Sequence, residues 1–110
     1  MVAQGIALLL ATTFTSTGIA AAADASATWN SNCATCHGKD GSGATMMGKK
    51  LNTKDYRDAK VQAVFSDAEA ERAIKEGVKT AGKETMKPFG GKLSDAEIKA
   101  LVAYIRSFKK

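Results

Sequence analysis

The sequence predicts an all-α fold in which a few short helices are separated by glycine-rich loops. Two Ser-x-x-Glu patterns, at Ser66 and Ser94, are capping boxes of the kind that open helices. Four glycines between residues 38 and 48 indicate a tightly turning loop. Alternating apolar and polar residues, which would indicate strands, are nearly absent. The 110 residues leave room for one domain.

Residues 1–23 form an uncharged stretch that we interpret as an export signal. An apolar block at Ile6–Ala11 precedes the run Ala20–Ala23, whose small side chains are typical of the site that signal peptidase cuts behind. The alternative is an uncleaved membrane anchor, which the five Thr or Ser residues between positions 6 and 23 disfavour. We therefore expect a cleaved leader over 1–23, a domain over 24–110, export to the periplasm, and no stable membrane insertion.

The predicted domain is small and basic. All 16 Lys and Arg and all 11 acidic residues follow position 23, which gives a formal net charge of +5. Such a surface favours an acidic partner, which could be nucleic acid, an anionic membrane or an acidic protein. Because acids are interspersed among the basic residues and the chain carries an export signal, we do not expect nucleic-acid binding. A core of this size also needs a staple, a metal or a cofactor to be more than marginally stable.

Three helices are expected in the domain. The first carries Ala25, Trp29 and Cys33 on one face, at spacings of four residues. The second opens at Ser66 and is closed by Gly77. The last follows Ser94 and places its apolar side chains at amphipathic spacing, at Ile98, Leu101, Val102 and Ile105.

The sequence Cys-Ala-Thr-Cys-His at residues 33–37 is the attachment pattern of haem c. Two thiols one helical turn apart can each form a thioether with one haem vinyl group, and the next residue, His37, can ligate the iron. A redox disulfide of the thioredoxin kind would belong beside a βαβ pattern, which is missing. Zinc would need a fourth ligand. A structural disulfide between Cys33 and Cys36 is the remaining alternative, and haem is favoured over it.

The sixth iron ligand is predicted to be Met86. The chain contains one histidine, so the sixth position falls to methionine, lysine, water or nothing. Met46 and Met47 follow His37 too closely to reach the other face of a haem easily. Met86 lies beside Pro88, which stiffens an extended segment between two helices. The alternative for Met86 is simple core packing.

These segments together resemble the small class I bacterial cytochromes c. The resemblance rests on Asn32–Gly38, on Met86–Ile98 and on Leu101–Arg106, and it extends over essentially all of 24–110. It implies one covalently attached haem, first and last helices that cross near it, and one exposed haem edge. Family members often carry Gly where this chain has Ala25, and we expect the helix crossing to survive that change. Trp29 is expected to pack near Tyr104 or Leu101.

The function that follows is one-electron transfer between respiratory or photosynthetic redox proteins, without enzymatic activity. Ligation by both His37 and Met86 would leave no open iron site, whereas a peroxidase-like enzyme or a gas-binding haem sensor, the two alternatives, would need one. Partners such as an oxidase, reductase or dehydrogenase are expected to dock at the haem edge of a monomer. Three lysines are candidates for that contact, namely Lys39, Lys83 and Lys87.

Overall fold

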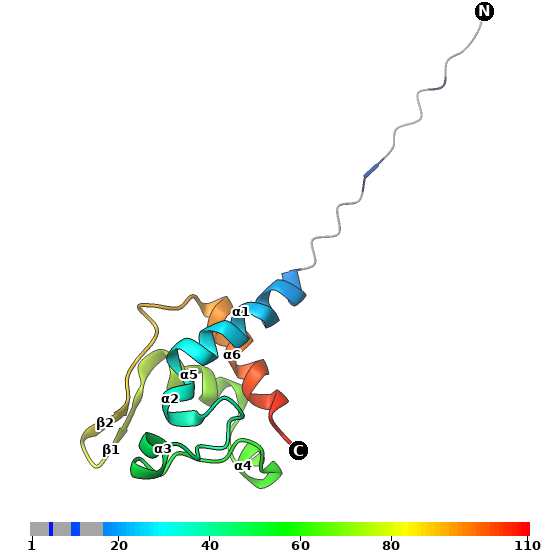
Figure 1. Cartoon of the computed structure of the whole chain (residues 1–110). Coiled ribbons are helices and arrows are strands. Elements are labelled where there is room, and N and C mark those ends of the chain that lie inside the picture. Colours follow the sequence, from blue (N-terminus) through cyan, green and yellow to red (C-terminus); the bar gives the residue numbers. More distant parts are fainter. Residues whose placement is uncertain (1–4, 6–9, 12–16) are drawn as a thin grey trace, which may run out of the picture.

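The computed structural model describes residues 5, 10–11 and 17–110, and within them the chain is helix-rich with one small sheet (Figure 1). The elements are α1 (Thr17–Asn32), α2 (Ala34–His37), α3 (Met46–Lys50), α4 (Ala59–Ala63), α5 (Asp67–Glu76), β1 (Val78–Thr80), β2 (Lys83–Met86) and α6 (Asp95–Ser107). Most of the leader predicted over 1–23 lies outside the described residues. Among the residues that the structure describes, no helix is long and apolar enough to cross a membrane.

The first and last helices, α1 and α6, pack against each other and cross in Figure 1, as predicted. Ala25 is 3% exposed, so the methyl group that replaces the usual glycine fits within the core. Trp29 is 1% exposed and meets the Tyr104 ring edge-on at 5.8 Å between ring centroids. The predicted apolar face of α6 is buried through Ile98, Leu101, Val102 and Ile105. These contacts form the centre of the hydrophobic core.

The caps of α5 and α6 explain where both helices begin. Ser94 accepts a hydrogen bond from the Glu97 amide, and the Glu97 carboxylate accepts one from the Ser94 amide, so this capping box is complete. Ser66 likewise accepts from the Glu69 amide, but the Glu69 carboxylate accepts from the Ser66 hydroxyl instead of its amide. Both starts were predicted, and α5 ends at Gly77 as expected.

Arg106 ties the connection between α4 and α5 to α6. Its guanidinium donates to the backbone carbonyls of Gln62 and Phe65, at 2.6 and 2.7 Å, and to the Asp67 carboxylate at 2.8 Å. The buried Gln62 amide nitrogen donates in turn to the carbonyl oxygens of Tyr56 and Ile105, at 2.7 and 2.9 Å. Each of these buried or half-buried polar groups is therefore satisfied, which polar groups in a core require.

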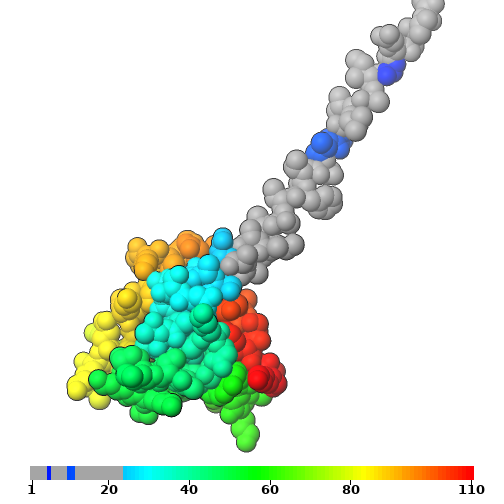
Figure 2. Space-filling model, viewed as in Figure 1, coloured from blue at the N-terminus to red at the C-terminus, as the bar shows by residue number. Residues whose placement is uncertain are grey.

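A β-hairpin between α5 and α6 was not predicted. Strands β1 and β2 pair antiparallel, with Val78 opposite Met86 and Thr80 opposite Lys83. The turn residues Ala81 and Gly82 both have positive φ, 52° and 78°, as two-residue hairpin turns of the primed type require. In Figure 2 the hairpin (yellow) lies at one side of the domain and the C-terminal residues (red) at the other.

Candidate cofactor site

One cavity of about 480 Å³ brings together all four residues predicted to hold the haem. Cys33, Cys36 and His37 line it from the segment around α2, and Met86 lines it from the end of β2. Further walls come from the loop after α3 and from the hairpin. Its lining is mainly apolar and its volume lies within the usual range for cofactor pockets, about 300–1,000 Å³.

The attachment segment is fixed by hydrogen bonds to its backbone. The Trp29 indole donates to the Gly38 carbonyl at 2.9 Å in a buried position. The Thr45 hydroxyl donates to the Cys36 carbonyl at 2.8 Å and accepts from the Gly48 amide, also at 2.8 Å. Helix α3 is thereby joined to α2, and the two residues on either side of His37, Cys36 and Gly38, are both held in place.

The His37 ring lies close to two aromatic side chains, Tyr56 and Trp29. Its ring stacks on Tyr56, with ring centroids 5.3 Å apart and planes inclined by 18°, and it also lies 5.3 Å from the Trp29 ring. Burial lowers the pKa of His37, so the imidazole is neutral and able to act as a ligand at physiological pH. Its Nδ1 atom is buried without a hydrogen-bond partner among the described residues. His37 also lines the cavity, so its ring is placed to contact a group held there.

Both cysteines are free thiols in the structure, so they form no disulfide. Burial, and then the neighbouring Cys36, raise the pKa of Cys33 to about 11. Within the described part of the chain, no group of three or more His, Cys, Asp or Glu side chains is arranged to hold a metal ion directly. Thiols, an imidazole and a thioether around an apolar cavity suit a haem, which needs covalent anchors, axial ligands and a dry pocket.

Of the other predicted residues, one lines this cavity and the rest do not. Lys87 lines it, and its ammonium lies 5.7 Å from the centre of the Phe89 ring. Lys83 on β2 and Lys39 after α2 are exposed and lie outside the lining. Met46, which the sequence ranks behind Met86 as a ligand candidate, is 88% exposed and does not line the cavity.

Many of the lining residues were not predicted, among them Tyr56 and Lys54. Tyr56 lies in a turn held by Arg57, whose side chain donates to Asp55 at 2.9 and 3.0 Å. The aromatic ring of Tyr56 was visible in the sequence, but no local pattern relates it to His37. Their stacking depends on the tertiary fold alone.

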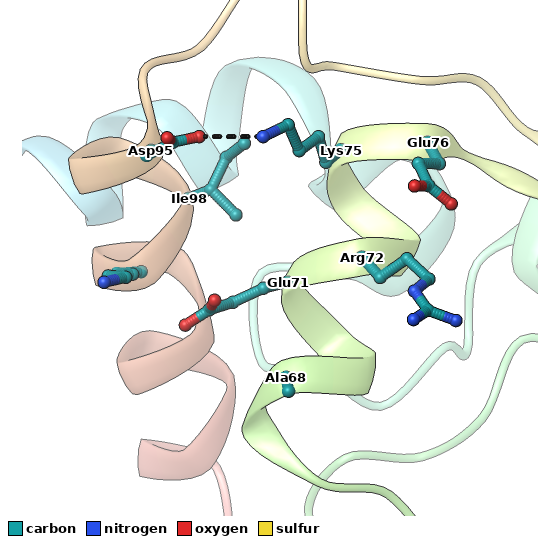
Figure 3. Close-up of a pocket in the computed structure, with 8 residues that line it drawn as sticks. Ala68, Glu71, Arg72, Lys75, Glu76, Asp95 and Ile98 are labelled. Atoms are coloured by element: carbon teal, nitrogen blue, oxygen red, sulfur yellow. Dashed lines mark hydrogen bonds and ion pairs between the residues drawn. The ribbon is translucent and has the colours of Figure 1, made fainter.

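A second hollow, of about 280 Å³, lies between α5 and α6 (Figure 3). Its charged lining includes Glu71, Arg72 and Lys75, and Lys75 pairs with Asp95 at 3.3 Å. It contains neither a thiol nor an imidazole, so it has no means of attaching a haem.

Comparisons with known proteins relate the chain to c-type cytochromes. The family described as cytochrome C oxidase, cbb3-type, subunit III matches residues 20–105. A cytochrome c6 from Picosynechococcus sp. is 37% identical over 103 residues, which cover 88% of this chain and 84% of that protein. A solved structure of the KustC0563 c-type cytochrome is 40% identical with a TM-score of 0.70, covering 78% of this chain and 98% of that one. A tyrosine-to-phenylalanine variant of the same cytochrome aligns with a TM-score of 0.68 at 40% identity, covering 78% and 99%.

The chain therefore belongs to the cytochrome c family, as a class I c-type cytochrome with one haem. Its cofactor is covalently bound haem c. It is an electron carrier that passes electrons between redox partners, and it is not an enzyme.

Proposed function

We propose that this electron carrier attaches its haem through Cys33 and Cys36 and ligates the iron with His37 and Met86. The observation that carries the proposal is the single cavity lined by both thiols, the only imidazole of the chain and Met86. These side chains come from two segments far apart in the sequence, and the fold brings them to one apolar space. When bound, the haem supplies a one-electron ferric/ferrous couple.

Each residue contributes one property to that couple. The two thioethers retain the cofactor in both oxidation states. His37 is held in place by its stacking on Tyr56 and by the hydrogen bonds that its two neighbours, Cys36 and Gly38, accept through their carbonyls. The Met86 thioether favours ferrous iron and so raises the reduction potential. It also excludes oxygen and peroxide from the iron, which distinguishes a carrier from a peroxidase-like enzyme or a gas sensor.

The absorption spectrum of the holoprotein tests the ligand assignment. Met86→Ala should abolish the weak far-red thioether-to-iron band of the ferric form and allow carbon monoxide to bind the ferrous form. Met46→Ala is the matched control, because Met46 is exposed and outside the cavity. Loss of the band in Met46→Ala, or its retention in Met86→Ala, would contradict the assignment.

The proposal includes a docking surface for an acidic partner around the cavity mouth. Its support is the net charge of +5 together with the cavity-lining Lys87 and the exposed Lys39 and Lys83. Lys54, which also lines the cavity, extends this group. Lysines at this position speed encounter with an acidic oxidase or reductase face, and salt screens the attraction.

Charge reversal tests the docking surface. Lys39→Glu and Lys87→Glu should slow electron transfer with a physiological partner at low ionic strength, and the difference should vanish at high salt. Lys99→Glu changes the net charge equally but lies on the hollow between α5 and α6, so it serves as the control. The docking surface would be contradicted if, at low ionic strength, Lys39→Glu and Lys87→Glu transferred electrons as fast as Lys99→Glu.

We further propose that residues 1–23 are removed on export and that the carrier works as a monomer in the periplasm. The apolar block, the Ala20–Ala23 run and the haem c motif support this location. The mass of the protein purified from a periplasmic fraction tests it, because cleavage after Ala23 leaves a chain that begins at Asp24. A protein of full mass in the membrane fraction would contradict it.

A further inference from the structure

The segment that carries Met86 lies against the C-terminal end of α5. The Phe89 amide donates to the Ile74 carbonyl at 2.9 Å, and the Gly90 amide donates to the Lys75 carbonyl at 3.0 Å. The carbonyl groups in the last turn of a helix receive no hydrogen bond from within the same helix. The two bonds therefore complete the helix end and hold residues 86–90 against it.

Gly77, which caps α5, packs directly against the backbone of the segment that carries Met86. An added Cβ at Gly77 would lie 2.7 Å from the Met86 carbonyl oxygen and 2.9 Å from the Pro88 nitrogen. Both are backbone atoms, so neither can rotate away as a side chain could. Gly77 also has φ 79° and ψ 178°, a conformation that is essentially restricted to glycine.

Gly90 makes a second close approach at the far end of the same segment. An added Cβ there would lie 2.9 Å from both the Cγ and the carbonyl oxygen of Lys75. The Lys75 side chain extends towards α6, where its ammonium pairs with Asp95 at 3.3 Å (Figure 3). Between the two glycines, Phe89 is 4% exposed and anchors the segment in the core.

We propose that Gly77 and Gly90 are positioning residues whose missing Cβ atoms let the Met86–Gly90 segment close onto α5, and that this contact sets where the Met86 thioether lies in the cavity. The inference rests on the proposed role of Met86 as the axial ligand. An added Cβ at either glycine would push the Met86–Gly90 segment away from α5, and the Met86 backbone would move with it. The thioether then leaves the position from which it could reach the iron.

The chain contains a matched control for each glycine. Gly82 has nearly the same φ as Gly77, 78°, yet an added Cβ at Gly82 meets nothing within 4 Å. Gly91 is the neighbour of Gly90 and is likewise open. Gly82→Ala therefore controls for an alanine at positive φ outside the contact with α5, and Gly91→Ala controls for loss of a glycine in this loop.

The experiment uses the four holoprotein variants, wild type and Met86→Ala, since the covalent haem stays attached when an axial ligand is lost. Gly77→Ala and Gly90→Ala should lose at least half of the ferric far-red band, bind carbon monoxide where wild type does not, and have a lower reduction potential. Gly82→Ala and Gly91→Ala should keep the wild-type band and potential. If Gly77→Ala fails to accumulate, the pair Gly90→Ala and Gly91→Ala decides the question, because neither glycine has a positive φ.

Two results would overturn the inference, and they differ from each other. If Gly77→Ala and Gly90→Ala melt earlier but keep the wild-type band and potential, the glycines serve stability alone and the ligand assignment survives. If Met86→Ala itself keeps the band, the axial role of Met86 fails, and the positioning role fails with it.

Discussion

Thr45 is the residue that joins α3 to the Cys33–His37 segment. Its hydroxyl is bonded on both sides, to the Cys36 carbonyl and from the Gly48 amide. Gly48 itself packs so tightly that an added Cβ would collide with the carbonyl oxygens of Gly43 and Cys36. The position of His37, the next residue after Cys36, therefore depends on a hydroxyl that lies outside the motif.

Thr45→Val should destabilise the holoprotein by about 1–3 kcal/mol, because two partly buried backbone groups lose their partner while the side-chain volume is kept. Thr45→Ser keeps the hydroxyl and should cost clearly less. Thermal or guanidinium unfolding of the two variants measures the difference. Equal stabilities would show that the hydroxyl adds nothing to the anchoring of α3.

Asp55 gives the domain a pH-dependent contribution to stability. The hydrogen bonds from the Arg57 side chain hold the pKa of this carboxyl below its ordinary value of 3.8. Since the folded pKa is the lower one, the stabilisation is present above about pH 4 and is lost as pH falls through the folded pKa. Asp55→Asn should therefore flatten the loss of stability between about pH 5 and pH 3.

Arg57→Gln removes the partner of Asp55 and should flatten the same part of the curve. The measurement is the free energy of unfolding at several pH values for wild type and both variants. Curves that run parallel to wild type down to pH 3 would show that the pair contributes no pH dependence.

At the scale of secondary structure, elements with a local signal were predicted and those without one were missed. Helices α5 and α6 were predicted because Ser66 and Ser94 each begin a Ser-x-x-Glu pattern. The hairpin was missed because its strands have three and four residues, are largely exposed and are joined by Ala-Gly, a weak turn signal. The ligand candidates were predicted by motif and elimination. Tyr56 and the two positioning glycines were not, since their roles depend on contacts between distant segments.

The two capping boxes should respond differently to substitution. Ser94→Ala should destabilise the protein by about 1 kcal/mol. Glu97→Ala should lower the melting temperature more than Glu69→Ala, because the Glu97 carboxylate accepts from a backbone amide and the Glu69 carboxylate only from a hydroxyl. Calorimetric melting of the two glutamate variants tests this order, and the reverse order would contradict it.

At the scale of the whole molecule, the cofactor cavity and the hydrophobic core share their residues. Cys33, Tyr56 and Met86 line the cavity and also pack against the buried core cluster. An empty cavity of about 480 Å³ would therefore remove packing partners from the core itself. A domain of this size has little stability in reserve.

The haem-free chain should consequently be largely unfolded. A Cys33→Ala, Cys36→Ala double variant produced without haem should show no cooperative thermal transition by circular dichroism. Cys33→Ala alone can still attach the cofactor through Cys36 and should melt cooperatively. A cooperative melt of the haem-free double variant would show that the polypeptide folds by itself.

The tip of the hairpin is a suitable site for attaching a label or a second domain. Ala81 and Gly82 are exposed, neither lines the cavity, and an added side chain at Gly82 meets nothing within 4 Å. Exposed tips of this kind tolerate insertions. A peptide tag, a fluorophore or a second domain could be joined at this turn while the Val78–Met86 pair at the base keeps its register. The carrier could thus be tethered to an electrode or a photosensitiser from the strand pair that also supplies its thioether.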